Sequence, residues 1–189
     1  MELNALLTEL AARKALIVHF SHRATMREGV VFPNDLRNAI AHKDCWTLSC
    51  CVVWPGHMME LPGEVGLVFL PTAIDQILSV AKTDSGSSQL VCGTELSGGM
   101  PLTPETFAET FQVDAGDYNE WRVRGAEPSA IFVVNPNKVW TKQRVTLPSD
   151  DLYGGENVSE VLVPVDQIRA VFPTLRLITM TPDGPMTVG

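Results

Sequence analysis

The chain has 189 residues, of which 45% are hydrophobic and 19% charged, and its formal net charge is −8. These values are typical of a globular protein, and the length suits one domain with a substantial core. Lys and Arg form no stripe along the sequence, which argues against nucleic acid as the main partner. The apolar runs are far shorter than the ~20 residues of a membrane span, and the N-terminus lacks the pattern of a secretory signal. We therefore expect a cytoplasmic protein with no membrane partner.

The first half of the chain predicts short helices and strands in irregular alternation. Four leucines at helical spacing indicate an amphipathic helix over residues 2–14. Residues 73–80 carry apolar side chains on one side and follow a capping threonine, Thr72, which predicts another helix. The other expected elements are a helix starting at Asn34 and strands at 15–20, 45–54, 65–70 and 89–94.

The second half is richer in predicted strands. Thr103 and Pro104 mark the start of a helix within 102–111, and a second short helix is expected at 165–172. Strands are expected at 118–124, 129–134, 138–147, 159–164 and 175–180, with an exposed loop at 148–157 and a flexible tail from about 181 to 189. Because these elements do not follow a regular βαβ order, we expect a single α+β domain. Its sheet should be mixed or mainly antiparallel, with short helices packed around it.

Cysteines and tryptophans have ordinary structural explanations. The cysteine spacing shows no disulfide framework, so free thiols are expected at Cys45, Cys50, Cys51 and Cys92. The tryptophans fall in predicted strands, so core positions are expected for Trp46, Trp54, Trp121 and Trp140. Glu120 and Arg122 alternate with Trp121, which is the pattern of a half-exposed strand.

Histidines and cysteines concentrate in one part of the chain, with all four histidines between residues 19 and 57. The segments "HFSH" and "HKDC" each place two imidazole or thiol ligands three residues apart, and zinc prefers such ligands. A zinc site is therefore an alternative, with His19, His22, His42 and Cys45 as its ligands. Against it, the spacing matches no zinc finger, and His19 and His22 would point to opposite faces of a strand. Ordinary core thiols and hydrogen-bonded histidines are the other interpretation.

Three polar groups mark a candidate active site. His19 ends an apolar strand and a polar turn follows it, which is a common way to build a site. Thr47 and Ser49 lie two apart in "CWTLSCCVV", so they share a face of a predicted strand. Glu160 opens the later strand "SEVLVP", which leads into a short helix. This order of histidine, hydroxyl strand and late glutamate resembles the ADP-ribosyltransferase superfamily, and within it the branch of DNA-targeting toxins of the DarT type.

The resemblance implies an enzyme that cleaves the nicotinamide–ribose bond of NAD and transfers ADP-ribose to an acceptor, or releases it as a glycohydrolase does. Glu160 would be catalytic and would stabilise the oxocarbenium-like centre, because a fixed carboxylate in a poorly solvated pocket suits a cation forming at C1′. His19 would anchor the nicotinamide end. The other residues that the resemblance assigns to NAD binding are Ser21, His22, Arg23, Arg27, Thr47 and Ser49.

Departures from the family pattern leave the acceptor open. The middle motif reads "LSCC" rather than Ser-Thr-Ser, and Glu156 and Glu160 lie too far apart for an E-x-E pair. Because the chain is acidic, we expect a protein acceptor rather than nucleic acid. The alternative functions are a non-catalytic acidic binding or inhibitor protein, of the immunity or phage accessory type, and a protein built on the His/Cys zinc site.

Overall fold

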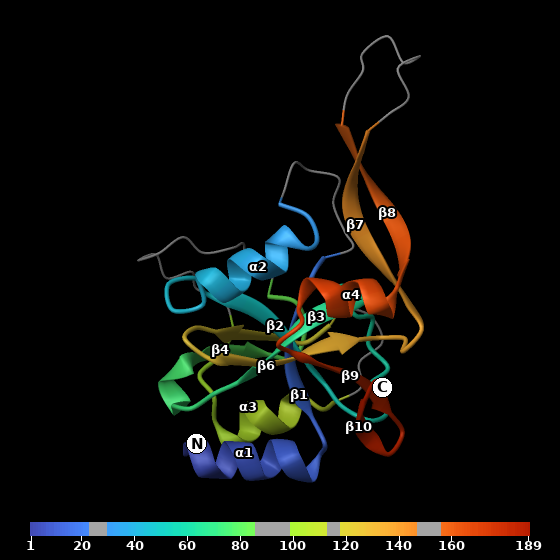
Figure 1. Ribbon diagram of the computed structural model, residues 1–189. Coiled ribbons are helices and arrows are strands. Elements are labelled where there is room, and N and C mark those ends of the chain that lie inside the picture. The colour runs from blue at the N-terminus through green and yellow to red at the C-terminus, as the bar shows by residue number, and fades with distance from the viewer. Residues whose placement is uncertain (23–29, 86–98, 113–117, 147–155) are drawn as a thin grey trace.

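The computed structural model describes residues 1–22, 30–85, 99–112, 118–146 and 156–189, and these form an α+β architecture (Figure 1). Strands make one sheet of eight, in the order β10-β9-β6-β3-β1-β2-β5-β4, and one sheet of two, β7-β8. Within the large sheet all neighbours run antiparallel except β6 and β9, which run parallel. The expected α+β class with a mainly antiparallel sheet is therefore confirmed.

The elements are short, as the frequent turn signals predict. The helices are α1 (Leu3–Ala12), α2 (Asn34–Ala41), α3 (Pro104–Glu109) and α4 (Val165–Val171). The strands are β1 (Leu16–Phe20), β2 (Leu48–Val53), β3 (Val65–Leu70), β4 (Ile77–Ala81), β5 (Glu120–Val123), β6 (Glu127–Val133), β7 (Lys138–Thr146), β8 (Glu156–Pro164), β9 (Arg176–Thr181) and β10 (Gly184–Thr187).

The helices all pack on one core cluster. Their buried side chains, such as Leu6 of α1, Leu36 of α2, Phe107 of α3 and Ile168 of α4, join strand residues in this larger cluster. Figure 1 shows α1 with α3 at one end of the molecule and α2 with α4 at the other, while the β7–β8 hairpin extends beyond them. The core is thus built from the apolar faces of short helices laid on the sheet.

Alternation along β1 divides its side chains between two environments. Ile17 belongs to the larger cluster, whereas Val18 and Phe20 belong to a smaller one made of strand residues. Among the described residues, the smaller cluster contains none from a helix, and Leu61 and Tyr118 pack against it. Strand β1 is therefore buried on both faces, and polar residues follow at its C-terminal end.

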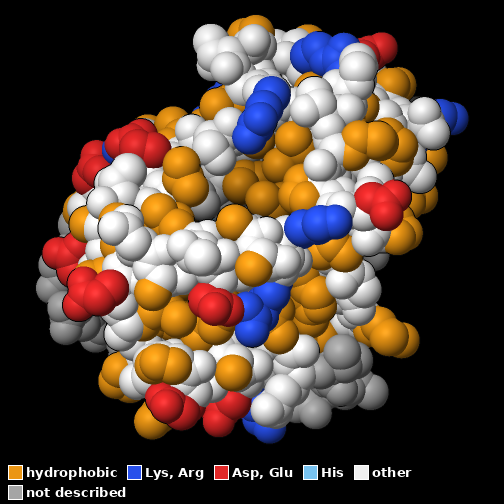
Figure 2. All heavy atoms as spheres, turned by 90° about the horizontal axis from the view of Figure 1, so that it is seen from below, with side chains coloured by type: hydrophobic (Ala, Val, Ile, Leu, Met, Phe, Trp, Pro, Cys, Tyr) orange, Lys and Arg blue, Asp and Glu red, His pale blue; other side chains and the backbone are white. Residues whose placement is uncertain are grey.

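Charged groups are dispersed over the surface that Figure 2 shows, which is the molecule seen from below. Lys and Arg side chains are scattered over this face, and some of them lie beside Asp or Glu. No helix in the described ranges is long and apolar enough to cross a membrane.

The predicted helix over 73–80 is wrong. Only Ile74–Gln76 makes a helical turn, of the 3-10 type, and β4 then begins at Ile77. Ile77 and Val80 are buried there because β4 pairs with β5. Apolar residues three positions apart fit one face of a helix, but the segment forms a strand because it pairs with β5.

The predicted flexible tail is also wrong. Gly184–Thr187 forms β10, which pairs antiparallel with β9 at the edge of the large sheet. The reversal between the two strands includes Gly184 at a φ of +120°, a conformation that favours glycine. The hydroxyl of Thr181 donates to the Gly184 carbonyl at 2.8 Å across this turn.

The predictions for the tryptophans and cysteines are confirmed in part. Trp121 and Trp54 are core residues as expected, whereas Trp140 is 40% exposed. Cys50 and Cys51 are free and buried as expected, but Cys45 is disulfide-bonded, and Cys92 lies outside the described residues. The expected strand at 89–94 and most of the expected loop at 148–157 also lie outside them, and β8 begins inside that loop at Glu156.

Candidate functional site

The C-terminal end of β1 carries the imidazole that the sequence singled out. Nδ1 of His19 lies 2.7 Å from the backbone oxygen of Ser49 on the neighbouring strand β2. A carbonyl only accepts, so Nδ1 carries the proton and Nε2 is left as an acceptor in the neutral ring. Burial lowers the pKa of His19 to about 4, although the hydrogen bond to Ser49 acts in the opposite direction. At neutral pH the ring is therefore uncharged and fixed in one tautomer.

A serine and an aspartate join β1 to α2. Ser21, just past the strand, donates its hydroxyl to Oδ2 of Asp35 at 2.5 Å, and the backbone N–H of Leu36 donates to Oδ1 at 2.9 Å. Asp35 stands in the first turn of α2, where a negative charge is favourable. Burial raises the pKa of Asp35, and the hydrogen bond from Ser21 opposes that shift. This pair fixes the helix start beside the strand end.

His22 lies among charged groups from several parts of the fold. Desolvation lowers the pKa of His22, although part of the residue remains exposed. The negative charges of Asp35, Asp84 and Glu120 act to raise this pKa, and the positive charge of Lys142 acts to lower it. His22 therefore marks the place where β1, α2, β5 and the β7–β8 hairpin bring their charges together.

Glu120 and Arg122 form a buried ion pair on β5, the strand next to β2. Nη2 of Arg122 lies 3.0 Å from Oε1 of Glu120, and the two side chains are 4% and 2% exposed. Ser85 donates its backbone N–H to Oε2 at 3.0 Å and also donates its hydroxyl there, and the hydroxyl of Ser49 donates to the same carboxylate. Burial acts to raise the pKa of Glu120, but these hydrogen bonds and Arg122 outweigh it, so the pKa lies below its usual value.

Ser49 is the link between the imidazole and this carboxylate. Its backbone oxygen accepts from His19, and its side chain donates to Glu120. Register explains the placement, because Ser49 stands opposite Arg122 in the β2–β5 ladder and so shares a face with it. We call His19, Ser21, His22, Asp35, Ser49, Glu120 and Arg122 the strand-end cluster.

Glu160 does not join the hydrogen bonds of the strand-end cluster among the described residues. It is exposed on β8, directly opposite Lys142 of β7. The positive charge of Lys142 in turn acts to lower the pKa of His22. No hydrogen bond or ion pair between Glu160 and His19 or Ser49 is formed among the described residues. The predicted glutamate therefore stands apart from the hydrogen bonds that hold the cluster together.

The other predicted NAD-binding residues have separate positions. Thr47 precedes β2 and is buried, with no hydrogen-bond partner for its hydroxyl among the residues that the structure describes. Arg23 and Arg27 lie outside the described residues. Of the groups predicted from sequence, the structure therefore brings together His19, Ser21, His22 and Ser49.

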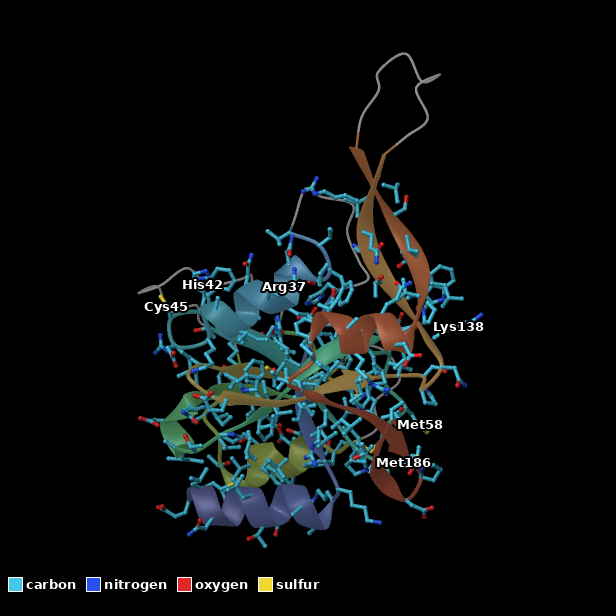
Figure 3. All side chains as sticks on the ribbon, in the orientation of Figure 1. Arg37, His42, Cys45, Met58, Lys138 and Met186 are labelled. Carbon is cyan, nitrogen blue, oxygen red and sulfur yellow. The ribbon has the colours of Figure 1, made fainter. Side chains whose placement is uncertain are left out.

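The alternative zinc ligands do not converge. His42 stacks on Trp46 with ring centroids 4.5 Å apart, and Cys45, which Figure 3 shows near His42, is disulfide-bonded. Nδ1 of His19 is engaged by Ser49. No group of three or more His, Cys, Asp or Glu residues suited to a metal ion occurs in the described part of the chain.

Sequence reasoning missed Asp35, Glu120 and Arg122. The expectation of a half-exposed strand around Trp121 is wrong, because β5 lies between β2 and β4 and Glu120 and Arg122 are buried. The available signal was a pair of opposite charges two residues apart in a strand, which share one face. Whether that face is buried depends on the strand order, which the sequence does not reveal.

Comparison with known proteins adds no relative. No protein-family model, no curated protein and no solved structure matches the chain.

Proposed function

We propose that the protein is an NAD-dependent ADP-ribosyltransferase-like enzyme, and that the strand-end cluster holds the nicotinamide end of NAD. The observation that carries the proposal is the hydrogen bond between His19 and Ser49. It joins an imidazole and a hydroxyl-bearing residue that lie 30 positions apart in the chain, and these are two of the three groups that the sequence resemblance assigns to one site.

The reaction requires a carboxylate near the ribose C1′. The C1′–N bond breaks with its electron pair leaving on nicotinamide, and the acceptor nucleophile, or water, then bonds to C1′. Glu120 is the deeper carboxylate, but Ser85, Ser49 and Arg122 occupy its oxygens. We assign it to holding Ser49 in place. Glu160 is exposed on β8, so its carboxylate is accessible to a substrate, and we assign the stabilisation of the oxocarbenium-like centre to it.

Neutral His19 suits the proposed binding role. With Nδ1–H donated to Ser49, the ring offers Nε2 as an acceptor for a ribose hydroxyl or a carboxamide N–H. Because its pKa is about 4, this acceptor persists across the physiological pH range.

Nicotinamide release from labelled NAD tests the proposal. We expect release by the parent protein, and a loss of about a hundredfold or more in Glu160→Gln, which keeps size and removes charge. Glu127→Gln is the matched control, because Glu127 is an exposed glutamate on β6 that pairs with Lys43. The proposal fails if the parent releases no nicotinamide, or if the two variants behave alike.

A non-catalytic binding protein is the second candidate function. The exposed Trp140 and Leu162 on the β7–β8 hairpin favour it, because large apolar side chains gathered on one surface mark interaction sites. A melting temperature that NAD leaves unchanged, together with absent turnover, would support this candidate over the enzyme.

A further inference from the structure

The segment between β2 and β3 ends against the strand-end cluster. Directly after β1, the backbone N–H of Ser21 donates to the carbonyl of Val65 at 2.8 Å. Gly63 lies so close to the carbonyl of Ser21 that no side chain fits at this position without a shift of the backbone. The backbone on both sides of Glu64 is therefore held against the C-terminal end of β1.

The side chain of Glu64 reaches the β7–β8 hairpin from this position. Its Oε2 accepts the backbone N–H of Trp140, on β7, at 2.8 Å. An N–H that is bonded to Glu64 takes no part in the ladder with β8, so it lies at the outer edge of β7. Among the described strands β7 and β8 form a sheet of their own. Glu64 thus joins the large sheet to an element with which that sheet shares no strand pairing.

The base of the hairpin has a second attachment. The backbone N–H of Val165 donates to the carbonyl of Asn137 at 3.0 Å, where β8 passes directly into α4. Val139 and Val163 are buried beside this base in the larger cluster. From there the hairpin extends past α2 and α4, as Figure 1 shows. An element that is held at its base can tilt, and the contact with Glu64 restricts this tilt because it holds the outer edge of β7.

Strand register connects this contact with the proposed catalytic carboxylate. Glu160 stands opposite Lys142 in the ladder that pairs β8 with the full length of β7. Lys142 is two residues beyond Trp140, which is about 7 Å along a strand. Because the two strands are paired throughout, a change in the direction of β7 moves Glu160 with it.

We propose that Glu64 is a positioning residue, which fixes the direction of the hairpin and so sets where Glu160 stands relative to the strand-end cluster. For its effect on turnover this inference rests on the proposed function, whereas the direction of the hairpin is measured without NAD. Glu64 acts through Trp140 and does not touch the substrate. Its position matters because a carboxylate stabilises a transition state only from a fixed place beside the developing charge.

The kinetic signature of a positioning role differs from that of a binding role. In the proposed reaction His19 binds NAD, and Glu160 acts when the C1′–N bond breaks. A displaced hairpin should therefore lower kcat and leave the KM for NAD nearly unchanged, because only the transition state loses an interaction. We expect kcat for nicotinamide release to fall about tenfold in Glu64→Ala, with KM within about twofold of the parent value.

Two variants serve as controls for Glu64→Ala. Glu64→Gln should keep kcat within about twofold of the parent value, because the amide oxygen still accepts the N–H of Trp140. Glu60→Ala removes an exposed glutamate from the same segment between β2 and β3. It should leave kcat and KM unchanged.

Residual dipolar couplings of the backbone amides test the attachment without NAD, because they report the direction of each element in the molecule. In Glu64→Ala the couplings of β7 and β8 should change together, while those of β1 and β3 keep their parent values. Glu64→Gln and Glu60→Ala should give the parent couplings throughout the chain.

Removal of the donor gives a second test, which leaves Glu64 in place. Trp140→Pro has no backbone N–H, and proline is tolerated at the outer edge of a strand. Trp140→Ala is the matched control, because alanine loses the same indole ring and keeps the N–H. We expect the proline variant to differ from the alanine variant in hairpin couplings and in kcat, in the same direction as Glu64→Ala differs from the parent.

Hairpin couplings that keep their parent values in both Glu64→Ala and Trp140→Pro overturn the inference. A changed direction with unchanged kcat also overturns it, and so does a kcat in Glu64→Gln as low as in Glu64→Ala. If the parent releases no nicotinamide, the proposed function fails, and the couplings alone decide whether Glu64 fixes the hairpin. Circular dichroism establishes that each variant is folded, and if Glu64→Ala does not fold, the comparison at Trp140 decides.

Discussion

Arg122 and Glu120 form an ion pair 3.0 Å long in which both side chains are almost completely buried. Ser85 and Ser49 complete the hydrogen bonding of the carboxylate. Taking two charges out of water is costly, and the pair is tolerated because each charge has a partner and further hydrogen bonds. Removing one partner leaves the other charge buried without compensation.

We therefore predict that Arg122→Met lowers the free energy of unfolding by about 3–5 kcal/mol. The double variant Glu120→Gln/Arg122→Met should recover part of this loss, because no uncompensated charge is left. Urea unfolding followed by circular dichroism measures both. The pair Lys43–Glu127, in which the Glu127 side chain is 61% exposed, is the control, and Glu127→Gln should cost less than about 1 kcal/mol. Equal losses of unfolding free energy in Arg122→Met and Glu127→Gln would contradict this prediction.

The hydrogen bond between His19 and Ser49 predicts a pH dependence of stability. The pKa of His19 is about 4 in the folded chain and 6.5 in the unfolded chain. Between these values the unfolded chain binds more protons, so stability falls as the pH drops from 6.5 toward 4 and is constant above 6.5. One such group contributes at most about 1.4 kcal/mol for each pH unit in this window.

The variant His19→Asn isolates this contribution, because asparagine keeps an N–H donor for Ser49 but does not titrate. Unfolding free energies measured at several pH values between 7 and 4 should fall less steeply in the variant than in the parent. His57, whose pKa burial also lowers to about 4, remains in both proteins and accounts for part of the shared slope. Parallel curves for parent and variant would show that His19 is not buried neutral.

Close approach of β1 and β3 gives a third prediction. A methyl group added at Gly66 would lie 2.6 Å from Cγ1 of Val18 and 2.7 Å from the carbonyl oxygen of His19. Gly66→Ala must therefore push β3 away from the end of β1, and we expect a loss of about 1–3 kcal/mol of stability. The His19 ring resonances in an NMR spectrum should move as well. Gly189→Ala, which meets nothing within 4 Å, should change neither quantity.

Sequence patterns predicted several elements correctly. The apolar run at 65–70 became β3 with the expected limits, and the four leucines near the N-terminus became the apolar face of α1. The segment 73–80 failed because its apolar spacing suits a helix and a strand alike. Only the position of β5 beside it decides between the two.

The sequence predicted only part of the candidate site. His19 and Ser49 each stand at a recognisable strand, and their contact follows from the pairing of β1 with β2. Glu120 was missed because its burial depends on β5 being an inner strand of the sheet. Asp35 was missed because its contact with Ser21 joins residues 14 positions apart that no sequence motif connects.

Attachment of β10 gives the last prediction, which concerns the segment that the sequence indicated as a flexible tail. Its strand pairs with β9 over four residue pairs, from Gly184↔Thr181 to Thr187↔Ile178. Lys14 packs its side chain against Gly184 and donates from Nζ to the carbonyl of Asp183 at 2.6 Å. Ending the chain after Asp183 would remove this ladder and expose one edge of β9. We expect a loss of roughly 1–3 kcal/mol of stability.

Hydrogen exchange at the β9 amides that face β10 provides the measurement, because these amides lose their partners in the shortened chain and should exchange faster. The matched control is Met186→Thr, which changes a side chain that is 48% exposed and keeps the backbone ladder. This variant should retain the slow exchange and nearly the full stability. If the shortened chain also retains both, the segment contributes nothing to the fold and is a tail in solution, so that the sequence-based expectation would hold after all.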